Sequence, residues 1–154
     1  MRNKSLNIVV IDYGMGNLHS VSKALQRVCP EARVTITSDA QIINTADRVV
    51  FPGVGAIGDC MTEIIRLELD DALGGAIRSK PVLAICVGMQ ALMTHSEESG
   101  GVECLGYLSG NVRRFRGGIV KGTRLKVPHM GWNEVYQTKP HALWRGIEQN
   151  ARMY

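Results

Sequence analysis

The chain reads Leu6-Asn-Ile-Val-Val-Ile11 and then Asp12-Tyr-Gly-Met-Gly-Asn17. The first stretch consists mostly of β-branched residues without alternating polar positions, and so predicts a strand that is covered on both faces. The glycines of the second stretch predict a turn. A helix should follow, because apolar residues recur at helical spacing from Leu18 to Val28. A buried strand, a turn and a helix in this order form the basic unit of a parallel α/β sheet.

Strand and helix patterns continue to alternate beyond this unit. We expect strands over residues 32–37, 47–51 and 82–85, and helices over residues 57–65, 69–79 and 89–93. This alternation predicts an α/β fold in three layers, with a mostly parallel central sheet and helices on both faces. Ligands should gather at the carboxyl ends of the strands.

Beyond about residue 100 the pattern changes to short strands separated by glycines and basic residues. Strands are expected over residues 110–115, 125–127, 133–136 and 151–154, and a short helix near His141. No repeat, low-complexity segment or linker divides the chain, so we expect one domain over residues 1–154.

Composition narrows the class of protein. The chain has 154 residues, of which 45% are hydrophobic and 21% are charged, as expected of one soluble domain with a sizeable core. Its apolar runs are far shorter than the roughly 20 residues that span a bilayer, and its start does not resemble a secretion signal, so we expect a cytoplasmic protein. The 4 cysteines form no C-x-x-C pair, so neither a metal site nor a disulfide framework nor a cofactor is expected.

The net charge of +4 arises from one basic segment. Its members, with no acidic residue among them, are Arg113, Arg114, Arg116, Lys121, Arg124 and Lys126. Such a segment could bind phosphate or an acidic partner, or could form a solvated hairpin around Gly117 and Gly118. Nucleic acid is not expected as a partner, because Phe115 is the single aromatic residue among these charges.

The most distinctive stretch is Lys80-Pro-Val-Leu-Ala-Ile-Cys86-Val-Gly-Met-Gln90, a strand that turns into a helix with cysteine at the corner. This order is typical of a nucleophile elbow, in which the turn exposes the side chain and small neighbours admit a substrate. The dipole at the start of the helix favours a reactive thiolate. Cys86 could equally pack as a small hydrophobic residue, and the residues alone leave both interpretations open.

A second stretch at the end of a strand is Phe51-Pro-Gly-Val-Gly55. Its two glycines would let main-chain N–H groups turn toward an anion or a developing oxyanion. They could equally serve only to connect the strand to the next helix.

Four motifs occur together in this chain: Asp12-Tyr-Gly-Met-Gly-Asn17, Phe51-Pro-Gly-Val-Gly55, Cys86-Val-Gly-Met-Gln90 followed by Ser96-Glu-Glu98, and Pro128-His-Met-Gly-Trp-Asn133. In this order and spacing they resemble the glutaminase subunits of imidazole glycerol phosphate synthases, which are class I, triad-type glutamine amidotransferases. The resemblance covers the whole chain and implies a flavodoxin-like glutamine amidotransferase fold.

The resemblance implies a reaction. Cys86 would attack the side-chain amide of L-glutamine, ammonia would leave, and water would hydrolyse the glutamyl thioester. Main-chain N–H groups of Val54 and Val87 would hold the oxyanion, and flipping of the Gly53–Val54 peptide would switch the site on when the partner binds its ligand. The positions implied to hold glutamine are Gly55, Gln90 and Glu98.

The resemblance also implies a partner. Family members dock onto a (β/α)8-barrel cyclase subunit and pass ammonia to it, for the formation of imidazole glycerol phosphate and AICAR in histidine biosynthesis. Asn17 and Trp132 match positions near the docking surface, although Trp132 could instead anchor the core.

The chain departs from the family pattern at two points. Ala84 stands where glycine is usual, which adds only a methyl group before the elbow. The His-Pro-Glu segment that supplies the triad histidine and glutamate has no counterpart here, and none of the 4 histidines matches it. We therefore expect this sequence to be part of a longer subunit with further strands of the sheet. A polypeptide ending at Tyr154 should show negligible glutaminase turnover and expose apolar sheet surface.

Three other functions fit parts of the sequence. An inactive binding domain of the same fold would use Cys86 only structurally. A different cysteine hydrolase would need a histidine after the nucleophile, where Val87 stands. A flavodoxin-like nucleotide or flavin module would use the turn at Gly14 to Gly16, which lacks the G-x-G-x-x-G spacing.

Overall fold

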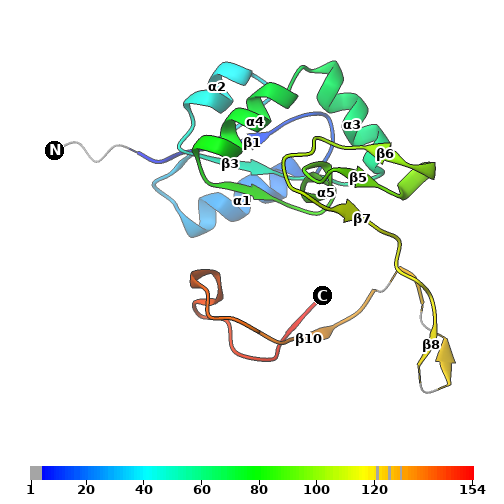
Figure 1. Ribbon diagram of the computed structural model, residues 1–154. Helices are drawn as coiled ribbons and strands as arrows, with labels where there is room; N and C mark the ends of the chain where they lie inside the picture. The colour runs from blue at the N-terminus through cyan, green and yellow to red at the C-terminus, as the bar shows by residue number, and fades with distance from the viewer. Residues whose placement is uncertain (1–4, 121, 125, 129) are drawn as a thin grey trace. The chain divides into compact units, whose positions relative to one another are not determined.

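The computed structural model describes residues 5–120, 122–124, 126–128 and 130–154. The chain divides into two compact units, the first ending at Arg114 and the second running from Phe115 to Tyr154 (Figure 1). Each unit is described by itself below. The single domain expected over residues 1–154 stays a prediction.

The first unit is built on a four-stranded parallel sheet. Its strands are β1 (Asn7–Ile11), β2 (Arg33–Thr37), β3 (Arg48–Phe51) and β4 (Val82–Ala84), in the order β2-β1-β3-β4 (Figure 1). All three pairings are parallel, and β1 lies inside the sheet, as its β-branched sequence predicts. The strand β4 lies at the edge of this sheet, where Leu83 is 56% exposed.

Helices cover both faces of this sheet. The helix α1 (Leu18–Val28) packs on one face, where Ile8, Val10 and Val50 form a buried cluster. The other helices are α2 (Ala40–Thr45), α3 (Ile57–Arg66), α4 (Asp70–Ser79) and α5 (Val87–Ala91). The larger core cluster, with Val9 and Phe51 from the sheet, includes residues of these four helices. The three-layer α/β fold is therefore confirmed.

The helix α2 was not predicted from the sequence. It has six residues, of which Ile43 is buried, too few for a recognisable apolar period. Asp39 starts the helix, because its Oδ1 accepts hydrogen bonds from the main-chain N–H groups of Gln41 at 2.7 Å and Ile42 at 3.3 Å.

A small second sheet follows the elbow. It consists of β5 (His95–Ser96), β6 (Val102–Glu103) and β7 (Asn111–Val112), and the 3-10 turn η1 (Glu98–Gly100) connects β5 to β6. The strand predicted over 110–115 is shorter than expected. The helix expected over 89–93 begins earlier, directly after Cys86.

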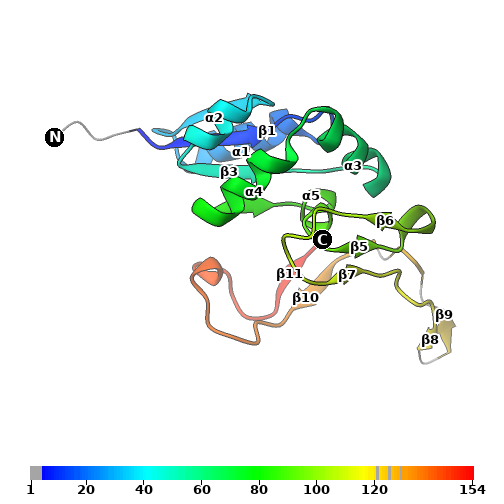
Figure 2. The same cartoon turned by 45° about the horizontal axis from the view of Figure 1, so that its top comes forward.

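The described residues of the second unit form two antiparallel strand pairs and a short helix. The strands β8 (Ile119–Val120) and β9 (Thr123–Arg124) pair antiparallel, as do β10 (Asn133–Val135) and β11 (Ala151–Met153), and η2 (Ala142–Trp144) is a 3-10 helix (Figure 2). The basic hairpin therefore turns near Gly122 and not around Gly117 and Gly118.

Some predictions of this region lie outside the described residues, namely those on Lys121, Leu125 and His129. The strand expected over 125–127 is wrong for its described part, because Lys126 and Val127 belong to no strand. Among the described residues, no helix has both the length and the apolar character needed to traverse a lipid bilayer.

Candidate active site

The side chain of Cys86 is exposed at the end of the parallel sheet. Cys86 lies between β4 and α5 with a φ of 56° and a ψ of −121°, a backbone conformation that residues other than glycine rarely adopt. Two hydrogen bonds hold this turn: Ile85 N–H donates to the Phe51 carbonyl at 3.0 Å, and Gly88 N–H donates to the Ile85 carbonyl at 3.1 Å. Such strain at a strand-to-helix turn is typical of a nucleophile elbow.

The environments of the four cysteines differ. Cys60 is buried, Cys29 and Cys104 are partly buried, and Cys86 is exposed. All of them are free thiols. The alternative in which Cys86 packs as a small hydrophobic residue is wrong, because its side chain is not in the core.

The segment from Phe51 to Gly55 packs against the elbow through the main chain. A Cβ atom added to Gly88 would overlap the Phe51 carbonyl oxygen, and one added to Gly53 would overlap Gly88 N. Glycine at both positions therefore allows the two segments to lie backbone to backbone. Among the hydrogen bonds of the described residues, none is donated by the N–H groups of Val54 or Val87.

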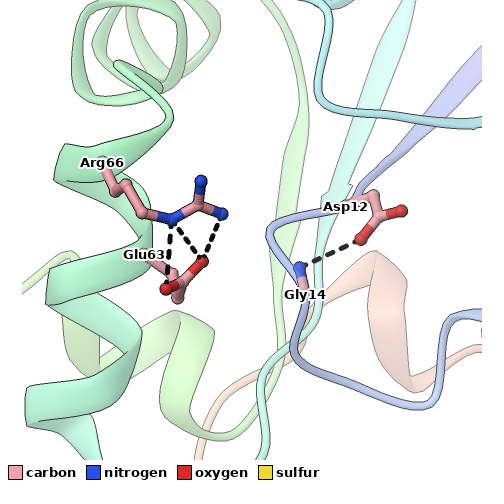
Figure 3. Close-up of polar contacts among 4 residues, drawn as sticks. All are labelled: Asp12, Gly14, Glu63 and Arg66. Carbon is pink, nitrogen blue, oxygen red and sulfur yellow. Dashed lines mark hydrogen bonds and ion pairs between the residues drawn. The ribbon is translucent and has the colours of Figure 1, made fainter.

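The turn after β1 lies beside this segment and beside α3. A Cβ atom on Gly55 would lie 3.0 Å from Met15 Cε, and one on Gly14 would lie 3.9 Å from Glu63 Oε2. Figure 3 shows the hydrogen bond of 3.0 Å from Gly14 N–H to Asp12 Oδ1 and the ion pair of 2.7 Å between Glu63 and Arg66. The ion pair is on the surface, where such pairs stabilise little.

Tyr13 is the buried centre of this turn. Its hydroxyl group donates a hydrogen bond to the Pro52 carbonyl oxygen at 2.9 Å and accepts one from Cys60 Sγ at 3.5 Å. Its ring packs against Phe51 with the ring centroids 5.3 Å apart. Burial, and then the hydrogen bond from Cys60, raise the pKa of Tyr13 well above its usual range. Burial also raises the pKa of the Cys60 thiol.

These shifts predict that the fold loses stability in alkali. Above about pH 8.5 to 10 the unfolded chain releases the protons of Cys60 and Tyr13, whereas the folded chain keeps them. The unfolded state then binds fewer protons, so the free energy of unfolding falls as the pH rises, by up to about 1.4 kcal/mol per pH unit for each retained proton. Urea denaturation between pH 8 and pH 11 should show a steeper fall for the unaltered protein than for Tyr13→Phe, and equal slopes would contradict this assignment.

Glu98 lies in η1 and Gln90 lies in α5, the helix that follows the elbow. Glu98 Oε2 accepts a hydrogen bond of 3.3 Å from Ile57 N–H, at the start of α3, where Ala56 provides no side-chain cap. Ser96 is buried, and its Oγ accepts a hydrogen bond of 3.2 Å from Glu98 N–H. Gln90 is partly buried and lies one helical turn after Cys86. Its main-chain N–H donates a hydrogen bond of 3.2 Å to the Cys86 carbonyl oxygen.

The positions implied to be near a partner are exposed. Asn17 caps α1, because its Oδ1 accepts a hydrogen bond of 3.2 Å from Ser20 N–H. Trp132, in the second unit, is 61% exposed and contacts the ring of Tyr154 with the centroids 5.7 Å apart. The alternative in which Trp132 anchors the core is therefore wrong.

Part of the basic segment faces acidic residues. Ser96, Glu97, Glu98, Ser99, Gly100, Val112, Arg113 and Arg114 line a shallow hollow between η1 and the end of β7. Glu97 Oε2 accepts a hydrogen bond of 3.0 Å from Arg114 N–H. The two arginines at the start of the segment thus have acidic neighbours within the first unit.

Comparison with known proteins identifies the family. Residues 9–154 match the family described as glutamine amidotransferase class-I. Over 148 residues the chain is 57% identical to imidazole glycerol phosphate synthase subunit HisH of Pseudomonas putida, an alignment that covers 96% of this chain and 69% of that protein. The chain belongs to this amidotransferase family, among the HisH subunits. The HisH subunit of Thiobacillus denitrificans is 56% identical over 153 residues, covering 97% of this chain and 67% of that protein.

The class-I amidotransferase fold is also found among solved structures. A crystal structure of a glutamine amidotransferase superimposes with a TM-score of 0.56 at 18% identity, over 69% of this chain and 56% of that chain. At this identity the likeness shows the fold alone. The family recognised from the four motifs and the predicted fold class are thus both confirmed.

Two buried residues of this amidotransferase were not singled out from the sequence. Tyr13 belongs to the first motif, but the sequence of this motif does not reveal that the Tyr13 hydroxyl group binds Pro52, 39 residues further along. Cys60 occupies an apolar position of α3 and looks like any core residue. Only the packing of α3 against the turn after β1 brings the two together.

Proposed function

We propose that this amidotransferase, as part of a longer subunit that supplies the triad histidine and glutamate, hydrolyses L-glutamine to glutamate and ammonia, with Cys86 as the nucleophile. One observation supports this most: Cys86 is exposed at a strained turn whose main chain packs directly against the segment from Phe51 to Gly53. The thiolate would attack the side-chain carbonyl carbon of glutamine, ammonia would leave, and water would then cleave the glutamyl thioester.

The main chain around Cys86 suits the transition state of this attack. As the thiolate adds, negative charge develops on the amide oxygen, and the N–H groups of Val54 and Val87 would donate to it. Val54 is 50% exposed, which leaves room for its peptide to turn. Gly55, Gln90 and Glu98 would hold the amino-acid part of the substrate, since they lie near the elbow or near the start of α3.

The ammonia would serve a partner subunit. The HisH relatives carry the name of imidazole glycerol phosphate synthase subunits. We therefore propose that this chain docks onto a (β/α)8-barrel cyclase subunit in the cytoplasm, and that the cyclase uses the ammonia for histidine biosynthesis. Asn17 and Trp132 are exposed and would contribute to the docking surface.

Selective labelling of Cys86 tests the nucleophile. A γ-diazoketone analogue of glutamine should alkylate Cys86 long before Cys29 in the complex with the cyclase, and glutamine should protect Cys86. The reason is that the analogue places its electrophilic carbon where the substrate carbonyl would lie. Peptide mapping by mass spectrometry measures the extent of labelling at each cysteine.

Iodoacetamide is the control reagent, because it reports thiol exposure without recognition of an amino acid. Cys86 should react with both reagents, but protection by glutamine should be large only for the analogue. Labelling of all four cysteines at similar rates, or labelling of Cys86 without protection, would support a binding domain in which Cys86 has no catalytic role.

A further inference from the structure

The buried hydroxyl group of Tyr13 connects three segments of the candidate site through hydrogen bonds. Tyr13 Oη donates to the Pro52 carbonyl oxygen at 2.9 Å and accepts from Cys60 Sγ at 3.5 Å. Tyr13 and Cys60 both have 0% exposure, so water does not compete for these hydrogen bonds. The Pro52 carbonyl belongs to the peptide bond that leads into Gly53.

Gly53 is confined on two sides. A Cβ atom on Gly53 would lie 2.8 Å from Tyr13 Oη and 3.0 Å from the carbonyl carbon of Val87. The Pro52–Gly53 peptide is thus held between the tyrosine hydroxyl and the start of α5. One peptide further along, Val54 is 50% exposed and Gly55 has a φ of 86°. Tyr13 and the start of α5 therefore hold the peptide before Gly53, whereas Val54 is half exposed to solvent.

We propose that Tyr13 is a positioning residue for glutamine hydrolysis, an inference that rests on the proposed function. Its hydroxyl group fixes the Pro52–Gly53 peptide, so that the following peptide alone turns its N–H toward the oxyanion. Cys60 assists by donating to the hydroxyl oxygen, which leaves the hydroxyl hydrogen for Pro52. No hydrogen bond joins Tyr13 to Cys86 among the described residues, although the two groups interact electrostatically, and Tyr13 acts through the main chain at Pro52 and Gly53.

The first test is the variant Tyr13→Phe in the complex with the cyclase. The Pro52 carbonyl then loses its donor and the peptide shifts, so kcat for glutamine hydrolysis should fall by about 10- to 100-fold. KM should change less than kcat, because Gly55 is the single member of this segment among the residues proposed to hold glutamine. A rise in KM with unchanged kcat, or kinetic constants equal to those of the unaltered protein, would overturn the proposal.

Tyr107→Phe is the matched control. The Tyr107 hydroxyl also donates to a main-chain carbonyl, that of Asp70, at 2.8 Å, but at the start of α4. The Tyr107→Phe variant should have a lower free energy of unfolding than the unaltered protein but the same kcat. If Tyr107→Phe lowers kcat as much as Tyr13→Phe does, the effect is one of general destabilisation and the positioning role is wrong.

A second measurement needs no variant and decides the matter if Tyr13→Phe does not fold. NMR of the unaltered protein in the complex would follow the amide signals of Gly53 and Val54 before and after Cys86 is alkylated by the diazoketone analogue. The Val54 amide should change its shift and exchange rate, whereas the Gly53 amide should not. Equal responses of both amides would overturn the proposal.

The kinetic assay separates this proposal from the function on which it rests. If the unaltered complex of the longer subunit with the cyclase hydrolyses no glutamine, the proposed function fails and the inference fails with it. If the unaltered complex is active and Tyr13→Phe is equally active, only the positioning role fails.

Discussion

Replacing Cys86 by serine is expected to lower glutamine hydrolysis by at least about 10⁴-fold, because the reaction loses the atom that forms the thioester. Serine has nearly the same size and leaves the elbow intact, but its hydroxyl group is a far weaker nucleophile than a thiolate. Coupled detection of glutamate in the complex with the cyclase measures this loss. The cyclase reaction supplied with ammonium salt should continue, since only the source of ammonia has been removed.

Cys29→Ser is the matched control for this variant. Cys29 follows α1, is partly buried, and its Sγ lies 3.8 Å from Glu31 Oε1, at the opposite end of α1 from Asn17. Its replacement should leave glutamine hydrolysis unchanged. Activity in Cys86→Ser close to that of Cys29→Ser would refute the assignment of the nucleophile.

Gly88→Ala should destabilise the protein and also inactivate it. A Cβ atom at this position would overlap the Phe51 carbonyl oxygen, which is main chain and has no flexible end to move aside. Overpacking of this kind costs about 1–3 kcal/mol of the free energy of unfolding. Separating the elbow from the segment after β3 by about 1 Å would also lower kcat by about 10²-fold. Urea denaturation and the glutaminase assay measure the two effects.

Gly75→Ala controls for the general effect of adding a methyl group to a helical glycine. A Cβ atom on Gly75 in α4 would lie 3.6 Å from Asn44 Oδ1, an ordinary contact. Stability should be unchanged or higher by about 0.5–1 kcal/mol, as is usual for alanine in a helix. If both variants unfold at the same urea concentration, the contact between Gly88 and Phe51 is less tight than the structure indicates.

The sequence predicted helices and strands best where a regular spacing of apolar residues extends over a long segment. The strand from Asn7 to Ile11 and the helix from Leu18 to Val28 have regular apolar spacing, and both were predicted nearly to their ends. The helix α2 was missed because one buried residue, Ile43, holds it in place. The strands of residues 95–135 are two or three residues long, so their position depends on pairing with distant segments, which no local pattern reveals.

The candidate site was predicted in part. A turn with an exposed Cys86 was predicted from the short strand before it and the small residues beside it. The exposure and the unusual φ of Cys86 agree with that prediction. The roles implied for Val54, Val87 and the residues that hold glutamine remain proposals. The contribution of Tyr13 was not predictable, because it depends on a contact with Pro52 through space.

The helix α3 meets the site at three successive points along one side. Its first N–H group binds Glu98, Cys60 binds the hydroxyl group of Tyr13, and Glu63 lies beside the turn at Gly14. Spacings of three residues place these contacts on a common stripe. Since a helix resists compression along its axis, any push on the outer end of α3 would displace the turn after β1 and the η1 segment together. One helix therefore contacts both Glu98 and Tyr13, and a ligand or partner that displaced α3 would change the positions of both residues.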